Sequence, residues 1–319
     1  MYKINFQKPI HIHFIGIGGI SMSGLAEILL EEGFTVSGSD AKESPLTKKL
    51  ESEGAVIHYG QCAENITDDI NCVVYTAAIN KSNPELMEAV GKKIPMLTRA
   101  ELLGQLMKNY DTPIAVSGTH GKTTTTSMIS EVLLAADMDP TISVGGILKT
   151  IGGNIRVGKS GNFITEACEY TNSFLHFYPK ISVILNIEED HLDFFKDLED
   201  IRHSFHQFSA LLPSDGTLII NGDIKDYQEI YEGLDCNVIT YGSSAEFDYS
   251  ATEIQYDEKG FVSFELLKHN TSCGRVQLSV TGDHNVSNAL AAIATAELLG
   301  IPMDTIRKGL LSFSGTDRR

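Results

Sequence analysis

The stretch "AVSGTHGKTTTT", from Ala115 to Thr126, decides how the fold is interpreted. It follows the apolar run "PIAV" and precedes a helical pattern over 123–136, which predicts a glycine loop between a strand and a helix. The glycines let backbone N–H groups approach phosphates, Lys122 adds a positive charge, and the Thr123 hydroxyl can bind Mg²⁺. The stretch departs from the usual GxxxxGK[ST] loop at the first glycine position, where Val116 stands. We therefore expect an ATP-binding loop made of Gly118, Thr119, His120, Gly121, Lys122, Thr123 and Thr124.

A second glycine loop, "GIGGIS" (Gly16 to Ser21), lies near the start of the chain. It links an apolar strand to a helix that begins near Ile20, so the first amides of that helix can bind a diphosphate. Asp40 closes the next strand, where a dinucleotide-binding fold places its ribose-binding acid. Ser21 replaces the third glycine of GxGxxG, and the loop could also serve tight packing alone. Because a complete dinucleotide domain needs more chain than precedes the ATP loop, a nucleotide diphosphate is favoured over NAD.

Composition narrows the class of protein. The 319 residues are enough for about two domains. The 25 Lys and Arg residues against 42 Asp and Glu residues give a net charge of −17, which argues against a nucleic-acid partner because such binding needs a basic face. No segment is apolar enough for a signal peptide or a membrane span, and five dispersed cysteines without a CxxC pair indicate free thiols. We expect a cytoplasmic protein without a membrane or nucleic-acid partner.

Two α/β series are visible along the chain. Apolar runs alternate with helical patterns over 11–109, which predicts a Rossmann-like domain at 1–109 with a parallel sheet. "NYDTP" interrupts the pattern, so 110–113 is interpreted as a linker. A P-loop ATPase-type α/β central domain follows at 114–319, and period-two alternation over 248–281 adds antiparallel strands to it.

Two polar residues follow buried strands of the second series. Glu166 comes directly after "NFIT", and His191 follows "ISVILN". Ligands bind at the carboxyl ends of parallel strands, so both are candidate metal ligands. His191 lies between acidic residues and could instead be a solvated loop residue, but its place at a strand end favours the ligand interpretation. His11 and His13 alternate along one strand and are interpreted as sheet residues.

Three polar residues open an alanine-rich helix: His284, Asn285 and Asn288. An asparagine there can cap the helix, and that alone could explain one of them. Two amides and an imidazole so close together could equally bind the edge of a purine. The sequence leaves both interpretations open.

In this order the motifs resemble those of the Mur ligases, the ATP-dependent ligases of peptidoglycan biosynthesis. The resemblance extends over all 319 residues and rests on "HFIGIGGISMSG", "SGSD", "NPE", "GTHGKTTT", "TEACEYTNSFL", "NIEEDHLD", "GDHNVSNALAA" and "FSGTDRR". Within the family, "GTHGKTTT" with "HFIGIGG" is typical of the branch that uses UDP-N-acetylmuramate. The resemblance implies UDP-N-acetylmuramate and L-alanine as substrates, with ATP and Mg²⁺ as cofactors, in a role that supports cell-wall formation, cell shape and cell division.

The resemblance also implies roles for single residues around ATP. Lys122 contacts the phosphates, Thr123 and Glu166 hold one Mg²⁺, and Glu166 and His191 hold a second. Asn285 and Asn288 lie near the adenine with His284 beside it. Arg319 ends an FxGxxxR pattern whose arginine reaches the γ-phosphate. The implied catalytic set is Lys122, Glu166, His191 and Arg319.

A second group of residues is implied for the UDP-sugar. Asp40 lies towards the uridine, and the "GIGGIS" loop and the "TAAI" turn surround the diphosphate. The residues concerned are Gly16, Gly18, Gly19, Ser21, Thr76, Ala77 and Ala78. Several positions depart from the family pattern and leave the sugar contacts open, namely Ser21, Gln61, Cys168 and Thr171.

The implied reaction explains why one chain carries two phosphate-binding loops. A carboxylate is a poor electrophile, so the γ-phosphoryl group of ATP first converts the lactyl carboxylate of the sugar to an acyl phosphate. The amine of L-alanine then displaces phosphate and forms an amide. Holding the two reactants in line can contribute roughly 7–11 kcal/mol.

Alternatives to this reaction stay open. Family members continue into a third domain, so we expect these 319 residues to bind UDP-N-acetylmuramate but to ligate slowly or not at all. A sister ligase that reattaches a recycled tripeptide and a non-catalytic UDP-sugar-binding module are alternatives. A nicotinamide oxidoreductase is a more distant one.

Overall fold

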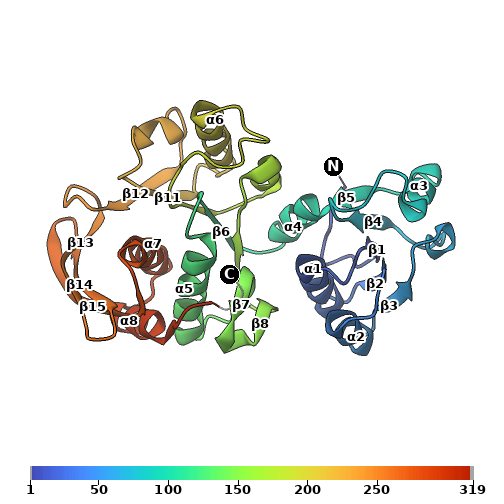
Figure 1. Ribbon diagram of the computed structural model, residues 1–319, viewed down its shortest axis with the longest axis horizontal. Coiled ribbons are helices and arrows are strands. Elements are labelled where there is room, and N and C mark those ends of the chain that lie inside the picture. The colour runs from blue at the N-terminus through green and yellow to red at the C-terminus, as the bar shows by residue number, and fades with distance from the viewer. Residues whose placement is uncertain (1, 317–319) are drawn as a thin grey trace. The chain divides into compact units, whose positions relative to one another are not determined.

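The computed structural model describes residues 2–316 and divides the chain into two compact units, Met1–Asn109 and Tyr110–Arg319 (Figure 1). The expected linker 110–113 is already part of the second unit. The ring of Tyr110 packs against Phe163 at 4.9 Å, and residues 112 and 113 pair with the neighbouring strand. No helix among residues 2–316 combines the length and apolar character that crossing a membrane requires.

The first unit contains a parallel sheet in the order β3-β2-β1-β4-β5. Its strands are β1 (His11–Ile15), β2 (Thr35–Asp40), β3 (Val56–Tyr59), β4 (Cys72–Tyr75) and β5 (Met96–Thr98). Its helices are α1 (Ile20–Glu31), α2 (Pro45–Ser52), the short 3₁₀ helix η1 (Ala63–Asn65), α3 (Pro84–Gly91) and α4 (Arg99–Met107). The predicted α/β fold with a parallel sheet is confirmed, whereas α2, α4 and β5 were not predicted.

The strand order places the glycine loop at the point where the connections reverse. β1 lies between β2 and β4, so the chain leaves β1 towards one edge of the sheet and later returns on its other side. Ligands of open α/β sheets bind beyond the carboxyl ends of the strands at such a switch point. Gly16 and Thr76, which follow β1 and β4, therefore lie where a ligand is expected.

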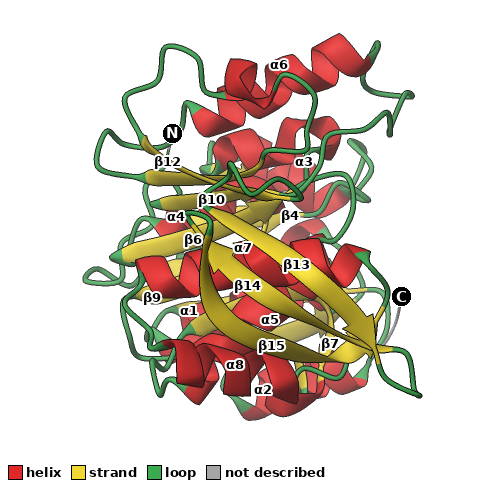
Figure 2. Ribbon diagram, turned by 90° about the vertical axis from the view of Figure 1, so that its left-hand side faces the viewer, coloured by secondary structure: helices red, strands yellow, loops and turns green. Residues whose placement is uncertain are grey.

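The second unit contains a mixed sheet in the order β15-β14-β13-β12-β11-β10-β6-β9-β7-β8. The strands from β13 to β7 in this order pair in parallel, and β8 pairs antiparallel with β7. At the other end β14 pairs antiparallel with both β13 and β15, as predicted for 248–281 (Figure 2). The strand bounds are β6 (Thr112–Ser117), β7 (Thr141–Leu148), β8 (Gly153–Arg156), β9 (Asn162–Glu166), β10 (Ile181–Ile184), β11 (Thr217–Asn221), β12 (Asn237–Gly242), β13 (Tyr249–Tyr256), β14 (Phe261–Lys268) and β15 (Thr271–Thr281). The short strand β8 was not predicted.

Helices cover both faces of this sheet (Figure 1). The helices are α5 (Lys122–Ala135), α6 (Leu198–Ser209), α7 (His284–Leu298) and α8 (Met303–Ser312), with 3₁₀ helices η2 (Lys149–Ile151), η3 (Tyr170–His176) and η4 (Tyr227–Ile230). In β11, Ile219 joins the apolar cluster of α5, α7 and α8, while Leu218 and Ile220 are buried on the opposite face. Phe205 and Phe208 of α6, a helix that was not predicted, are also buried outside that cluster.

Helix α8 packs directly against α5 at a glycine. A Cβ added at Gly309 would lie 2.5 Å from Val132 Cα and 2.9 Å from its backbone nitrogen. Gly309→Ala should therefore destabilise the second unit by roughly 1–3 kcal/mol, although alanine favours a helix interior by about 1 kcal/mol. Urea unfolding followed by hydrogen exchange of second-unit peptides measures the change.

Gly153→Ala is the matched control in the same unit. A Cβ at Gly153 would have its nearest neighbour, Ile155 O, at 3.9 Å, so the stability of this variant should change little. Equal stabilities of the two variants would contradict the packing argument.

Candidate functional site: a strand-to-helix phosphate loop and a neighbouring acid–histidine group

The ATP loop predicted from sequence connects β6 to α5 and is made tight by two glycines. Gly118 has φ +144°, and Gly121, with φ +86°, is the N-cap of α5. A Cβ at Gly118 would lie 2.9 Å from Leu185 Cβ, and one at Gly121 would lie 2.7 Å from Asn288 Oδ1. Both positions therefore need glycine for backbone conformation and for space. The backbone amides of the first turn of α5 face this loop, which is a suitable geometry for an anion.

The segment after β10 braces this loop. Asn186 receives a hydrogen bond from the backbone N–H of His120 at 2.7 Å and donates to the carbonyl of the same residue at 3.0 Å. Thr119 donates its backbone N–H to Asn186 O at 3.2 Å, and the Thr119 hydroxyl accepts from Glu188 N at 2.9 Å. Asn186 was missed by the sequence analysis, although it ends the predicted strand "ISVILN" beside the ligand edge of the sheet.

Lys122, the first residue of α5, folds back over the loop. Its ammonium group donates to Gly118 O at 2.5 Å and Thr119 O at 3.2 Å. It also forms an ion pair with Glu169 Oε2 at 2.9 Å, and the two side chains are 12% and 3% exposed. Thr123 is buried and Thr124 is half-buried behind it. Glu169, which the sequence analysis did not select, is thus the acid that contacts the loop lysine.

Glu166, the predicted metal ligand, ends β9 next to the start of the loop. It pairs in register with Val116 of β6, and its Oε1 accepts a hydrogen bond from Gly145 N on β7 at 2.5 Å. A Cβ at Gly145 would lie 2.9 Å from both carboxylate oxygens, so the carboxylate rests directly on that glycine. The carboxylate is therefore held against the edge of β7.

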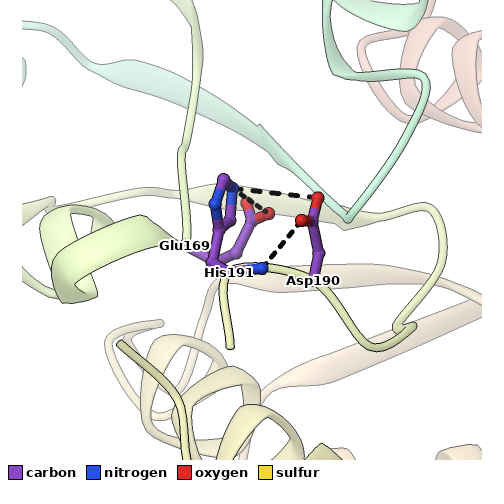
Figure 3. A group of neighbouring side chains, drawn as sticks. All are labelled: Glu169, Asp190 and His191. Atoms are coloured by element: carbon purple, nitrogen blue, oxygen red, sulfur yellow. Dashed lines mark hydrogen bonds and ion pairs between the residues drawn. The ribbon is translucent and has the colours of Figure 1, made fainter. Parts of the chain in front are cut away.

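A different set of ligands comes together around His191. The carboxylates of Glu169 and Asp190 both point towards its imidazole (Figure 3). The distances from His191 Nε2 are 3.9 Å to Glu169 Oε1 and 3.8 Å to Asp190 Oδ2. Their ligand atoms lie within 4.8 Å of one another, and among residues 2–316 this is the group of three acid, cysteine or histidine ligands with that spacing. Two carboxylates and an imidazole are a suitable donor set for a divalent cation, and Glu166 is not a member.

The backbone around this group is strained. His191 has φ +52°, and Thr171 and Asn172 have φ +54° and +56°. Non-glycine residues in the left-handed region are uncommon and tend to occur at functional sites. The ring of Tyr170 stacks on the His191 imidazole at 4.5 Å, and its hydroxyl donates to Asp193 at 2.8 Å, which raises the pKa of Tyr170. The imidazole is thereby held in one orientation.

The polar residues at the start of α7 divide into two kinds. Asn285 and Asn288 are 6% and 5% exposed, and Asn288 Nδ2 donates to Asn285 Oδ1 at 3.0 Å. Asn288 also lies against Gly121, so the structure brings this residue to the ATP loop. His284 is exposed. The capping interpretation is wrong for both asparagines, because Asp283 occupies the N-cap position.

One predicted ATP contact remains outside this core, and another falls outside the described residues. His120 is exposed, with its Nε2 3.8 Å from Glu188 Oε2. Arg319, assigned to the γ-phosphate by resemblance, lies outside the described residues 2–316.

The glycine loop of the first unit is fixed by the end of β2. Gly16 N and Ile17 N donate to Ser39 O at 2.8 and 3.0 Å, and Gly18 N donates to Asp40 Oδ2 at 2.8 Å. Asp40 Oδ1 accepts a hydrogen bond from the backbone N–H of Ala41 at 2.7 Å, so the carboxylate links the loop to the chain after β2. A Cβ at Gly16, whose φ is +85°, would lie 3.0 Å from Thr76 Cγ2. The structure therefore brings the "GIGGIS" loop and the "TAAI" turn together.

The remaining predicted substrate residues lie on the exposed side of this loop. Four of them are exposed: Gly19, Ser21, Ala77 and Ala78. Gly19 is the N-cap of α1 and makes no side-chain cap, so the first amides of the helix are open to an anion. The groups that this loop offers to an anion are therefore mainly backbone amides.

A buried acid supports this loop from below. Glu85 is fully buried and accepts hydrogen bonds from Ser39 Oγ and Asn65 Nδ2, both at 2.5 Å. His13 Nε2 lies 3.9 Å from Glu85 Oε1, and His13 Nδ1 bonds the Ser37 hydroxyl at 2.9 Å. The carbonyl of Ser39 also accepts the loop amides of Gly16 and Ile17. Glu85 therefore supports the loop indirectly, through Ser39.

Comparisons with known proteins identify the family of the chain. The family description "Mur ligase family, catalytic domain" matches residues 11–111, and "Mur ligase middle domain" matches residues 116–296. The chain belongs to the Mur ligase family. Its members are ATP-dependent ligases, and the resemblance stated from sequence is confirmed.

Curated Mur ligases resemble the chain over its whole length. The UDP-N-acetylmuramate–L-alanine ligase of Agathobacter rectalis is 62% identical over 100% of this chain and 70% of the relative. The enzyme of the same name from Lachnospira eligens is 60% identical with the same coverage.

Solved Mur ligase structures share the fold. The UDP-N-acetylmuramate:L-alanyl-γ-D-glutamyl-meso-diaminopimelate ligase of Neisseria meningitides has a TM-score of 0.86 and 31% identity, covering 98% of this chain and 100% of that one. The UDP-N-acetylmuramate–alanine ligase of Thermotoga maritima has a TM-score of 0.82 and 29% identity, covering 97% and 70%.

The buried acid of the first unit makes its stability depend on pH in this Mur ligase. Burial alone raises the pKa of Glu85, but the His13 imidazole and hydrogen bonds from Ser39 and Asn65 bring it below the ordinary 4.5. A lowered folded-state pKa means that the ionised acid stabilises the unit above pH 4.5, and that this contribution is lost as the pH falls through the folded-state value. Glu85→Gln should lower stability at pH 7 by roughly 1–3 kcal/mol and flatten its loss in acid.

Hydrogen exchange of first-unit peptides between pH 7 and pH 3.5 measures both effects, once corrected for the intrinsic pH dependence of exchange. Glu88→Gln is the control, because Glu88 lies on the same helix but makes an exposed ion pair with Lys92 at 3.7 Å. A Glu85→Gln variant with the stability and acid profile of this control would exclude the role given to the buried carboxylate.

Proposed function

We propose that this chain acts in the ATP-dependent joining of L-alanine to UDP-N-acetylmuramate, a step of peptidoglycan synthesis. The observation that supports this best is the 62% identity, over the whole chain, with an enzyme named for that reaction. The fold alone is shared with a ligase named for a tripeptide substrate, but at 31% identity. The L-alanine reaction is therefore the preferred assignment.

In this proposal the second unit binds ATP. Gly118 and Gly121 bring loop amides to the phosphates, Lys122 pairs with them, and Asn288 lies beside the loop for the nucleoside. Mg²⁺ supplies positive charge that offsets the triphosphate. The residues proposed to hold Mg²⁺ form two sets: Thr123 and Glu166 beside the loop, and Glu169, Asp190 and His191 in the neighbouring group.

The first unit is proposed to bind the UDP part of the sugar nucleotide. Gly16, Gly18 and Gly19 offer backbone amides to the diphosphate, together with the first turn of α1. Ser21 and the turn over 76–78 line the same side of the loop, and Asp40 directs the loop towards the uridine.

The chemistry assigned to the pair of loops is a phosphoryl transfer followed by acyl transfer. A carboxylate oxygen of the sugar attacks the γ-phosphorus, and the bond between that phosphorus and the bridging oxygen of ADP breaks. The amine of L-alanine then attacks the acyl carbon, phosphate leaves with the bonding electrons, and the nitrogen loses a proton. Lys122 stabilises the charge on the transferred group.

A cytoplasmic site of action is part of the proposal. All five cysteines of the chain are unpaired in the structure, which suits a reducing compartment.

The reaction can be tested with the natural-length protein that carries these residues. With ATP, Mg²⁺, UDP-N-acetylmuramate and L-alanine it should release phosphate and form UDP-N-acetylmuramoyl-L-alanine, identified by mass spectrometry. With L-alanyl-γ-D-glutamyl-meso-diaminopimelate in place of L-alanine, turnover should be slower by a factor of at least roughly 100, as expected when a site discriminates by polar contacts. Faster turnover with the tripeptide would assign the chain to the second type of ligase.

The role of the loop lysine can be tested by nucleotide binding to the chain itself. Lys122→Ala should weaken Mg·ATP binding by roughly 1.5–3 kcal/mol, or about 10- to 150-fold, because one charge-assisted bond to the phosphates is lost. Isothermal titration calorimetry measures the dissociation constant. Lys259→Ala, in the exposed β13–β14 turn of the same unit, is the control; equal affinities of the two variants would remove Lys122 from the site.

A further inference from the structure

Lys122 has no spare donor for a phosphate in this structure. An ammonium group has three N–H donors and no acceptor. Its partners here are Gly118 O, Thr119 O and the carboxylate of Glu169. A phosphate oxygen that binds Lys122 must therefore displace one of these partners.

Glu169 is the partner that a phosphate would displace. The two carbonyl groups belong to the loop, whose backbone is held by Asn186 and by the two glycines. Glu169 comes from a separate segment, between β9 and η3, and contacts Lys122 only through its side chain. It is also an anion, so a phosphate that approaches Lys122 meets a like charge that is 3% exposed and poorly screened by solvent.

The carboxylate of Glu169 also lies close to the His191 imidazole. Its Oε2 is the atom closer to Lys122, at 2.9 Å, while its Oε1 lies 3.9 Å from His191 Nε2 (Figure 3). Asp190 Oδ2 completes this group, 3.8 Å from the same Nε2 atom. Glu169 therefore lies between one fixed cation, the lysine, and one group of atoms that can hold a divalent cation.

We propose that Glu169 is a positioning residue that couples divalent-cation binding to nucleotide binding. Without a cation, Glu169 holds Lys122 against its own loop and opposes the phosphates. With a cation at Glu169, Asp190 and His191, Glu169 shares its charge with that ion, and Lys122 becomes available. This inference rests on the proposed ATP site. It adds a reason, located in the protein as well as in the nucleotide, why ATP binding depends on a divalent cation.

A simpler role for Glu169 makes the opposite prediction. If the ion pair only keeps Lys122 in the correct orientation for ATP, removal of the carboxylate weakens nucleotide binding with or without metal. If Glu169 opposes the phosphates, removal of its charge strengthens metal-free binding. The sign of the change without metal therefore distinguishes the two roles.

The test compares Glu169→Gln with the unmodified 319-residue chain by isothermal titration with ATP, in Mg²⁺ and in EDTA. Chelation of Mg²⁺ by ATP itself affects both proteins equally, so the informative quantity is the ratio of the two dissociation constants in each protein. Glu169→Gln should bind metal-free ATP at least roughly fivefold more tightly, the lower end of typical coupling between sites, and its Mg²⁺ enhancement should shrink accordingly. An unchanged ratio, or equal weakening in both buffers, overturns the proposal.

Two further variants separate charge from shape. Glu169→Asp keeps the negative charge and should retain weak metal-free binding; tight metal-free binding by this variant would contradict a charge effect. Glu258→Gln removes an exposed carboxylate from the β13–β14 turn of the same unit and should leave the ratio unchanged. Circular dichroism confirms that each variant is folded before its affinities are compared.

The metal alone provides a second readout that needs neither nucleotide nor activity. Mn²⁺ binding, followed by the loss of the free-ion electron paramagnetic resonance signal, should be weaker in Glu169→Gln than in the unmodified chain. Equal Mn²⁺ affinities would overturn the cation side of the proposal. If the unmodified chain binds no ATP in either buffer, the proposed ATP site itself is wrong; if it binds ATP but the ratio does not change, only the coupling is wrong.

Discussion

The turn from β6 into α5 has no space for a side chain at Gly118 or Gly121, and the proposed ATP site depends on that constraint. At Gly118 and Gly121 the backbone is in a conformation that favours glycine, and neighbouring atoms occupy the place of a Cβ. Because the turn is so tight, α5 begins directly beneath it, and the amides of its first turn face the loop. Lys122 becomes the first residue of that helix and can reach the carbonyl of Gly118. The same geometry thus supplies the amides, the helix dipole and the ammonium group together.

The first unit uses a related turn without a lysine. The loop after β1 is fixed by Ser39 O and by the carboxylate of Asp40, and the start of α1 provides the exposed amides. The contacts of Asp40 give it a structural role in this loop: one carboxylate oxygen accepts the N–H of Gly18, and the other accepts the N–H of Ala41. A carboxylate has about four lone-pair sites, so Asp40 can close the loop and still accept from a ribose hydroxyl. In the proposed site, backbone amides therefore provide most of the contacts to the diphosphate.

The sequence was sufficient where a local pattern has one structural outcome. The strands that flank each loop, Gly121 before Lys122, and the alternation over 248–281 all formed the predicted elements. The sequence did not predict which of two similar side chains would point into the site. "TEACEY" contains two glutamates, and spacing alone favoured Glu166 at the end of β9. The turn after β9, which passes through left-handed residues at 171 and 172, directs Glu169 to Lys122 and His191. That turn contains no glycine, so the sequence gives no signal of its left-handed backbone.

Helices with little apolar content were also missed. α2 begins at a capping box around Ser44 and α6 at the Asp197 cap, and both expose a large polar face. Such helices are stabilised by their caps and by packing of a narrow stripe, so apolar periodicity in the sequence is a weak signal for them. Asn288 illustrates a third limit. Its approach to Gly121 joins segments far apart in the chain, and no local pattern reports that contact.

Because the chain is acidic, the balance of charges around the proposed ATP loop determines how a triphosphate is attracted or repelled there. With a net charge of −17, the protein as a whole repels a triphosphate. Close to the loop, Lys122 and the start of α5 contribute roughly one and a half positive charges, and the carboxylates of Glu169 and Asp190 together outweigh them. A divalent cation reverses the sign of this balance, and it does so next to the buried carboxylate that engages the lysine. On this charge balance, the proposed anion site of this acidic protein depends on a cation as much as on its glycines.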